Sequence, residues 1–160
     1  MGIRFTIDEV PGGRQICANS LHPGLAGQNE NPIMLRCITS TMALDWTAGP
    51  LAEGLRLYDS GEFFAAHEAW EAVWLKAPEP EKTFLQGLIQ VTAAFHHWRR
   101  GNRLGTFLLL QAALRRLEKY PPVFGGICLK QLCGDIRERM QVLEENQASL
   151  QMVSPRIEPS

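Results

Sequence analysis

The stretch Gly61-Glu62-Phe63-Phe64-Ala65-Ala66-His67-Glu68-Ala69-Trp70-Glu71-Ala72-Val73-Trp74 decides the fold. It is mostly apolar and has the periodicity of a helix, but polar residues interrupt it. His67 and Glu71 are four residues apart and therefore share one helix face. Polar groups on an apolar helix face are costly unless something binds them, so we expect this face to hold a ligand or a hydrogen-bonded network.

A second apolar segment carries a similar stripe. Gln86, Gln90 and His97 are four and then seven residues apart, which returns each of them to one side of a helix at about 100° per residue. If the two stripes face each other, the protein has one polar pocket between two core helices. Gly87 lies beside this pocket and must permit the close approach of another backbone or side chain, because glycine inside a helix costs up to about 1 kcal/mol relative to alanine.

Helix breakers divide the chain into five predicted helices. Pro50 suits the first turn of a helix, Gly61 is a left-handed stop, and Gly101-Asn102 reads as a stop followed by a cap for the next helix. A weak echo at an offset of 40 residues relates residues 55–72 to residues 95–112, as expected for paired hairpins. We predict an all-α fold, a compact bundle of two helical hairpins plus a C-terminal helix. The expected helices run from Pro50 to Gly61 and over about 62–76, 81–100, 103–119 and 126–147.

The bundle domain is expected to cover residues 46–147. Residues 1–45 are rich in Pro, Gly, Asn and Gln and sustain no helical period, so we interpret them as a disordered or non-native N-terminal extension. We expect the folded protein, and the natural translation product, to begin near Met42. Residues 148–160 are expected to be a flexible tail.

Composition excludes several functional classes. The chain has 160 residues, 45% of them hydrophobic, and a formal net charge of −1, which fits one soluble domain. Its basic residues form only short clusters, so we do not expect nucleic acid as a partner. The four cysteines form no CxxC pair, which argues against a zinc knuckle or a disulfide framework. Without a bilayer-length apolar run or a secretory signal, we expect a cytoplasmic protein that binds no membrane.

The sharpest local motif is His67-Glu68-x-x-Glu71. It resembles the zinc-peptidase helix His-Glu-x-x-His with glutamate in place of the second histidine. One helix turn brings two ligands to one ion, and the intervening Glu68 can act as a base. Catalytic zinc commonly takes three protein groups and a water, and His97 is the natural third ligand. The residues expected around the ion are Gln86, Gln90, Trp74 and Asn102.

The alternative is that the same polar groups satisfy one another. His67, Glu71, Gln86, Gln90 and His97 would then form a hydrogen-bonded network that only fixes helix register. His96 points away from the glutamine stripe, and adjacent histidines usually place one ring inward and one outward. We therefore assign His97 to the pocket, although the order of the two histidines stays open.

Residues 51 to about 120 resemble a bacterial and archaeal family, domain of unknown function 309. The resemblance rests on the 61–74 stretch quoted above, on Leu85-Gln86-Gly87-Leu88-Ile89-Gln90, and on His97 followed by Arg100-Gly101-Asn102. It implies an all-α bundle whose polar signature residues gather between two helices. It also implies the label attached to that family, predicted metal-dependent hydrolase.

Three functional hypotheses follow. If the protein is an enzyme, a divalent ion (zinc, manganese or iron) held by His67, Glu71 and His97 lowers the pKa of a bound water, and Glu68 accepts a proton during hydrolysis of a small-molecule substrate. If it has no cofactor, it is a non-catalytic helical-repeat-like module that binds a peptide or partner helix. In the third hypothesis the polar network stabilises a homo-oligomer that covers the apolar surface of the helices.

Overall fold

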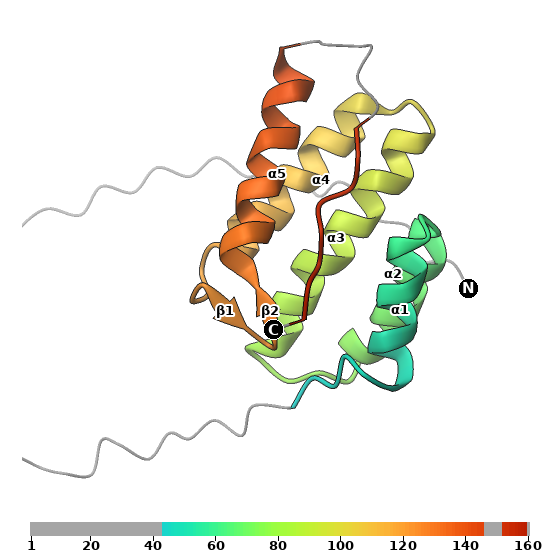
Figure 1. Ribbon diagram of the computed structural model, residues 1–160, viewed down its shortest axis with the longest axis vertical. Coiled ribbons are helices and arrows are strands. Elements are labelled where there is room, and N and C mark those ends of the chain that lie inside the picture. The colour runs from blue at the N-terminus through green and yellow to red at the C-terminus, as the bar shows by residue number, and fades with distance from the viewer. Residues whose placement is uncertain (1–42, 146–151, 160) are drawn as a thin grey trace, which may run out of the picture. The chain divides into compact units, whose positions relative to one another are not determined.

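The computed structural model describes residues 43–145 and 152–159 and contains five helices and one small β-hairpin in that part of the chain (Figure 1). This confirms the predicted all-α fold. None of the described helices is long and apolar enough to cross a membrane. The elements are α1 (Gly49–Asp59), α2 (Phe63–Trp74), α3 (Glu81–Arg99), α4 (Arg103–Leu117), β1 (Val123–Phe124), β2 (Ile127–Cys128) and α5 (Leu129–Glu144).

Helices that are adjacent in sequence pack against each other. α1 packs on α2, α2 on α3, α3 on α4 and α4 on α5, so α3 lies between the α1–α2 hairpin and α4 (Figure 1). α3 is the longest helix and supplies many of the fully buried core residues. These are Phe84, Leu85, Leu88, Val91, Ala94 and Phe95. Burial of this much apolar area on one helix fixes the bundle around it.

The α1–α2 hairpin is held by aromatic packing. Gly61 adopts the left-handed conformation (φ 82°) that ends α1, as its position in the sequence predicts. Trp70 of α2 is fully buried, stacks on Tyr58, and donates from Nε1 to the Leu51 carbonyl at 3.1 Å. A Cβ at Gly54 would overlap the Trp70 indole, so this glycine is what lets α1 approach α2.

The α3–α4 hairpin packs through an aliphatic side chain at its closest approach. Gly101 (φ 74°) ends α3, and Asn102 caps α4 by accepting a hydrogen bond from the Gly105 amide at 2.9 Å. A Cβ at Gly87 would lie 2.7 Å from a methyl group of the fully buried Leu117. The close approach predicted at Gly87 is therefore confirmed, and its partner is α4.

The β-hairpin before α5 differs from the predicted sequence of elements. We expected a helix from about residue 126, but β1 pairs antiparallel with β2 and α5 begins at Leu129. Gly125 and Gly126 both have positive φ and make the turn between the strands. The Gly125 carbonyl accepts a hydrogen bond from Trp46 Nε1 at 2.6 Å, which joins the hairpin to the chain before α1.

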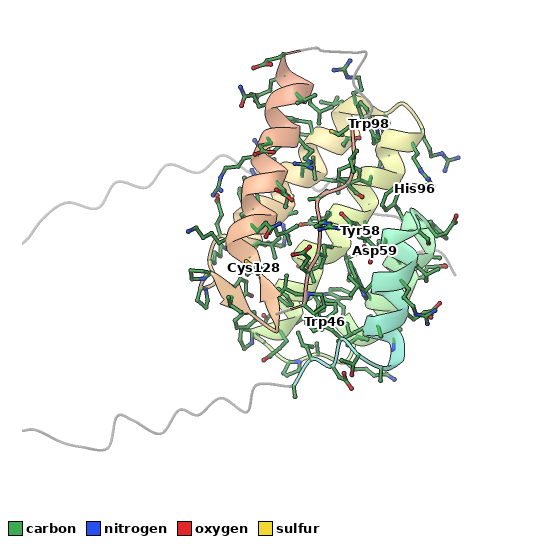
Figure 2. All side chains as sticks on the ribbon, viewed as in Figure 1. Trp46, Tyr58, Asp59, His96, Trp98 and Cys128 are labelled. Carbon is green, nitrogen blue, oxygen red and sulfur yellow. The ribbon has the colours of Figure 1, made fainter. Side chains whose placement is uncertain are left out.

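The C-terminal segment 152–159 packs on the bundle instead of forming the expected flexible tail. Tyr58 lies beside this segment and donates a hydrogen bond to the Pro155 carbonyl at 2.8 Å (Figure 2). Ile157 is buried, and Pro159 forms a β-bridge with Ile127. An apolar anchor and a buried hydroxyl partner thus order a segment that its two prolines predicted to fray. The predicted extension 1–45 lies outside the described residues up to position 42.

Candidate functional site

α3 is buried on much of its circumference, and one stripe along its whole length is partly exposed. We call this the exposed stripe of α3, and its members are Lys82, Gln86, Gln90, Ala93 and His97. Their spacing of three, four or seven residues places them on one side of the helix. Both glutamines of the predicted pocket and His97 therefore share a face, as their sequence spacing predicts.

α2 borders one edge of the exposed stripe. The Lys82 ammonium lies 5.1 Å from the centre of the Trp74 ring, in a cation–π contact. Further along, the Phe64 and His96 rings are 5.6 Å apart. Figure 2 shows His96 on the side of α3 that is directed toward the α1–α2 hairpin.

α4 borders the other edge through Arg116. Its Nε donates to Gln86 Oε1 at 3.3 Å, and its Nη1 donates to Gln90 Oε1 at 3.1 Å. Nη1 also donates to the Ala112 carbonyl at 3.2 Å. We use the name α2–α3–α4 face for the exposed stripe of α3 together with the adjoining sides of α2 and α4.

His67 and Glu71 form a separate pair on α2. His67 Nδ1 lies 3.9 Å from Glu71 Oε2, and both side chains are largely buried. Burial lowers the pKa of His67, and the negative charges of Glu71 and Glu68 oppose this shift without cancelling it. The ring is therefore neutral at pH 7, the state in which histidine binds metals or accepts protons. Glu68 is exposed on the outer side of α2.

His97 is engaged at the end of α3. Asn102 Nδ2 lies 3.0 Å from His97 Nδ1, while Asn102 Oδ1 accepts from Gly105. Because the amide oxygen is used by the cap, the amide nitrogen must donate to the imidazole, which places the ring proton on Nε2. The Asn102 side chain therefore both caps α4 and orients the His97 ring.

The predicted pocket is therefore divided. Within residues 43–145 and 152–159, no three His, Cys, Asp or Glu side chains lie close enough together to hold a metal ion, so His67, Glu71 and His97 are not gathered as expected. His96, not His97, contacts the α2 side. Gln86 and Gln90 bond to Arg116 of α4 instead of orienting ligands beside His67.

Arg116 is the residue that sequence reasoning missed. The chain from Lys82 to Leu117 contains six basic residues and no acidic residue, a local bias that the overall charge of −1 hides. That bias is the sequence signal that could have drawn attention to it. The six are Lys82, Arg99, Arg100, Arg103, Arg115 and Arg116.

Large apolar side chains are exposed next to these polar groups. Phe64 of α2 and Leu75, which directly follows α2, are each 57% exposed, and Leu108 of α4 is 44% exposed. Phe64 and Leu75 follow the same side of α2 as Glu71, and Leu108 lies on the outer crest of α4. Apolar side chains that remain exposed on both sides of a polar stripe are typical of interaction surfaces.

Comparison with known proteins gives a family likeness without an activity. Residues 51–109 match the family described as Domain of unknown function (DUF309), which confirms the resemblance over that segment. An uncharacterized protein from Aquifex aeolicus (strain VF5) is 33% identical over 92 residues, which make up 57% of this chain and 26% of the relative. The chain thus spans about a quarter of the length of that relative. Neither description states a substrate, a metal or a partner.

Proposed function

We propose that the protein is a non-catalytic helical module that binds a protein partner on the α2–α3–α4 face. The observation that carries this proposal is the exposure of Phe64 and Leu75 along the α2 edge of the exposed stripe of α3, with Leu108 on the outer crest of α4 beyond the other edge. The polar residues of the same face brace the helices through Gln86, Gln90 and Arg116. A braced face with apolar contacts at its borders is suited to an amphipathic helix.

The chemistry of the partner follows from charge. Two cations, Lys82 and Arg116, lie on the α2–α3–α4 face, and neither forms an ion pair with a carboxylate of the described residues. A basic surface favours an acidic partner, both by steering the encounter and by excluding basic competitors. The proposed occupant is therefore an amphipathic helix that presents apolar residues to Phe64 and Leu108 and acidic residues to the exposed stripe of α3.

Site-specific photocrosslinking in the host cell tests this proposal. A photoreactive residue replaces Phe64, Leu108 or, as a control on the β-hairpin, the 52% exposed Val123. We expect the same protein to be captured from positions 64 and 108 and not from position 123. The purified partner should then bind Phe64→Ala and Leu108→Ala at least about fivefold more weakly, as for central contacts of an interface, with Val123→Ala unchanged.

Two outcomes contradict the proposal. Equal capture from all three positions would mean that the face is not selective. Capture of a second copy of this chain from positions 64 and 108 would replace the acidic partner with a homo-oligomer.

The second candidate function is metal-dependent hydrolysis at the His67–Glu71 pair. It is supported by the 3.9 Å separation of His67 Nδ1 and Glu71 Oε2, and by the burial that lowers the pKa of His67. An ion bound there would have two ligands from this chain, His67 and Glu71, and would supply an acidified water. Zinc, manganese and iron all accept this pair of donor types.

Elemental analysis of the untagged protein separates the two candidates. Under the hydrolase candidate, the wild type carries a stoichiometric ion, His67→Ala loses it, and the matched control His97→Ala retains it because His97 is engaged with Asn102. A wild type that stays metal-free after loading with zinc, manganese or iron removes this candidate and leaves the interaction module.

A further inference from the structure

The Arg116 guanidinium is oriented by neutral groups alone. It donates to Gln86 Oε1, Gln90 Oε1 and the Ala112 carbonyl, at 3.3, 3.1 and 3.2 Å. Among the described residues, no carboxylate lies within ion-pair distance of it, and no partner is found for its Nη2. Arg116 is half-buried, so a well-positioned cation keeps its charge on the α2–α3–α4 face without compensation.

The two glutamines add donors to the same place. Arginine has no acceptor, so each glutamine must present its oxygen to Arg116 and turn its Nε2 group away. Neither Nε2 group has a hydrogen-bond partner in the part of the chain that the structure describes. The open polar atoms around Arg116 are therefore N–H donors, which is the arrangement that suits a ligand group able only to accept.

The next positions along the α2–α3–α4 face also carry N–H donors. Lys82 precedes Gln86 by one turn; its ammonium lies over the Trp74 ring and forms no ion pair with a carboxylate of the described residues. The Trp74 Nε1 donor is buried and has no hydrogen-bond partner there. Glu71, the acidic residue that α2 contributes to this face, is paired with His67. The donor-rich strip thus runs from Trp74 and Lys82 to Arg116.

We infer that Arg116, Gln86 and Gln90 form an oxyanion-binding site whose ligand is a carboxylate. The carboxylate comes from an Asp or Glu side chain of the acidic partner helix. The inference rests on the proposed function only for this source, because the site itself is defined by the three side chains. Bonds from a guanidinium to a carboxylate are charge-assisted and about twice as strong as bonds between neutral groups.

Charge favours a carboxylate over a phosphate. A single guanidinium with neutral amide donors balances one negative charge, whereas a phosphate monoester carries about −1.5 to −2 at pH 7. Arg116 also lies in the last turn of α4, where the negative end of the helix dipole disfavours a dianion further. In the part of the chain that the structure describes, no helix N-terminus or glycine-rich loop contributes to the site, although these are the usual phosphate cradles.

The site is tested with small anions on the full-length protein. Acetate or inorganic phosphate is titrated into ¹⁵N-labelled protein at constant ionic strength, and the side-chain signals of Arg116 Nε, Gln86 and Gln90 are followed. We expect acetate to shift these signals saturably and to bind more tightly than phosphate. Arg116→Gln should weaken acetate binding about tenfold or more, as expected for loss of a charge-assisted bond.

Arg115→Gln is the matched control, because it removes the same charge one residue away while Arg115 bonds to Gln111 on the outer surface. Acetate binding should change less than about twofold in this variant, since exposed charges are screened. Arg116→Lys, which keeps the charge and the helix, should restore part of the binding. If Arg115→Gln weakens binding as much as Arg116→Gln, if phosphate binds more tightly, or if no signal saturates, the inference is overturned.

The two proposals fail in different ways. A partner helix whose affinity depends on Leu108 but not on Arg116 would overturn the carboxylate site and leave the interaction module intact. Acetate binding that depends on Arg116, with no partner captured from positions 64 and 108, would support the site and contradict the proposed function.

Discussion

The α1–α2 and α3–α4 hairpins each turn at a glycine with positive φ, but they carry opposite charge. From Gly49 to Trp74 the first hairpin carries five acidic residues and one basic residue, whereas from Glu81 to Leu117 the second carries six basic residues and one acidic residue, Glu81. The first is packed by aromatic rings around Trp70, and the second by aliphatic side chains around Leu117. The two hairpins therefore share a helix–glycine–helix order but differ in charge, and the second supplies most of the basic residues.

The hairpins do share one device. In each, a mid-helix glycine receives a large side chain from the paired helix: Gly54 receives Trp70, and Gly87 receives Leu117. The two hairpins differ in how far the side chain that packs on the glycine can move. A buried indole is rigid, while a leucine has alternative rotamers. This contrast leads to an ordered series of stability predictions.

Gly54→Ala is expected to have the largest effect. The new methyl group would overlap the Trp70 indole, which is also fixed by its hydrogen bond to Leu51. Overpacking of a rigid core should lower the free energy of unfolding by about 3 kcal/mol or more. Urea unfolding followed by circular dichroism measures this. A loss below about 1 kcal/mol would show that the α1–α2 interface can accommodate the added methyl group at Gly54.

Gly87→Ala is expected to cost less, about 1–2 kcal/mol, because Leu117 can move by part of the overlap and alanine gains helix propensity. The matched control is Gly134→Ala in α5, where a Cβ would meet nothing within 4 Å. That variant should be neutral or up to about 1 kcal/mol more stable. If both alanines have the same effect, close packing of α3 on α4 is not what places glycine at position 87.

Tyr58→Phe should cost about 1 kcal/mol through loss of the hydrogen bond to the Pro155 carbonyl. Burial raises the pKa of Tyr58, so its hydroxyl stays protonated and donates throughout the usual pH range. The loss should be accompanied by faster proteolysis after Arg156, because the C-terminal segment would detach more often. Unchanged proteolysis would mean that Ile157 alone holds the segment.

The smallest predicted effect concerns pH. Burial lowers the pKa of His67 and of His96 below the ordinary value of 6.5. Below that value the unfolded chain binds these protons more readily than the folded chain does, so stability should fall as the pH decreases from 7 to 5. His67→Gln should make this decrease shallower in urea titrations at several pH values. An identical pH dependence in the variant would show that His67 is not desolvated by folding.

The sequence predicted the helices well because their boundaries are chemical. A glycine in the left-handed conformation ends a helix, as Gly61 and Gly101 do, and the Asn102 side chain caps the helix that follows. Helical spacing in turn identifies the exposed stripe of α3. The β-hairpin was missed although Gly125-Gly126, between two short apolar pairs, is a hairpin turn signal. The apolar residues after this turn fit a helical pattern, so the predicted last helix begins a few residues before α5 does.

The candidate site was predicted only in part, for a geometric reason. A helical wheel places Gln86 and Gln90 on one stripe but cannot say which neighbouring helix they reach. The long Arg116 side chain of α4 takes their oxygens, and His67 stays with Glu71 on α2. His97 was assigned to the α2 side, but an asparagine five residues later binds its ring. Such choices depend on packing, which spacing alone does not specify.

The most direct test of this account is a pair of double-mutant cycles on the free energy of unfolding. Gln90→Ala is combined with Arg116→Ala in one cycle and with His67→Ala in the other. We predict a coupling energy of about 0.5–3 kcal/mol between Gln90 and Arg116, and additivity within about 0.5 kcal/mol between Gln90 and His67. Strong coupling to His67 with none to Arg116 would restore the single polar pocket between α2 and α3 and contradict the division described above.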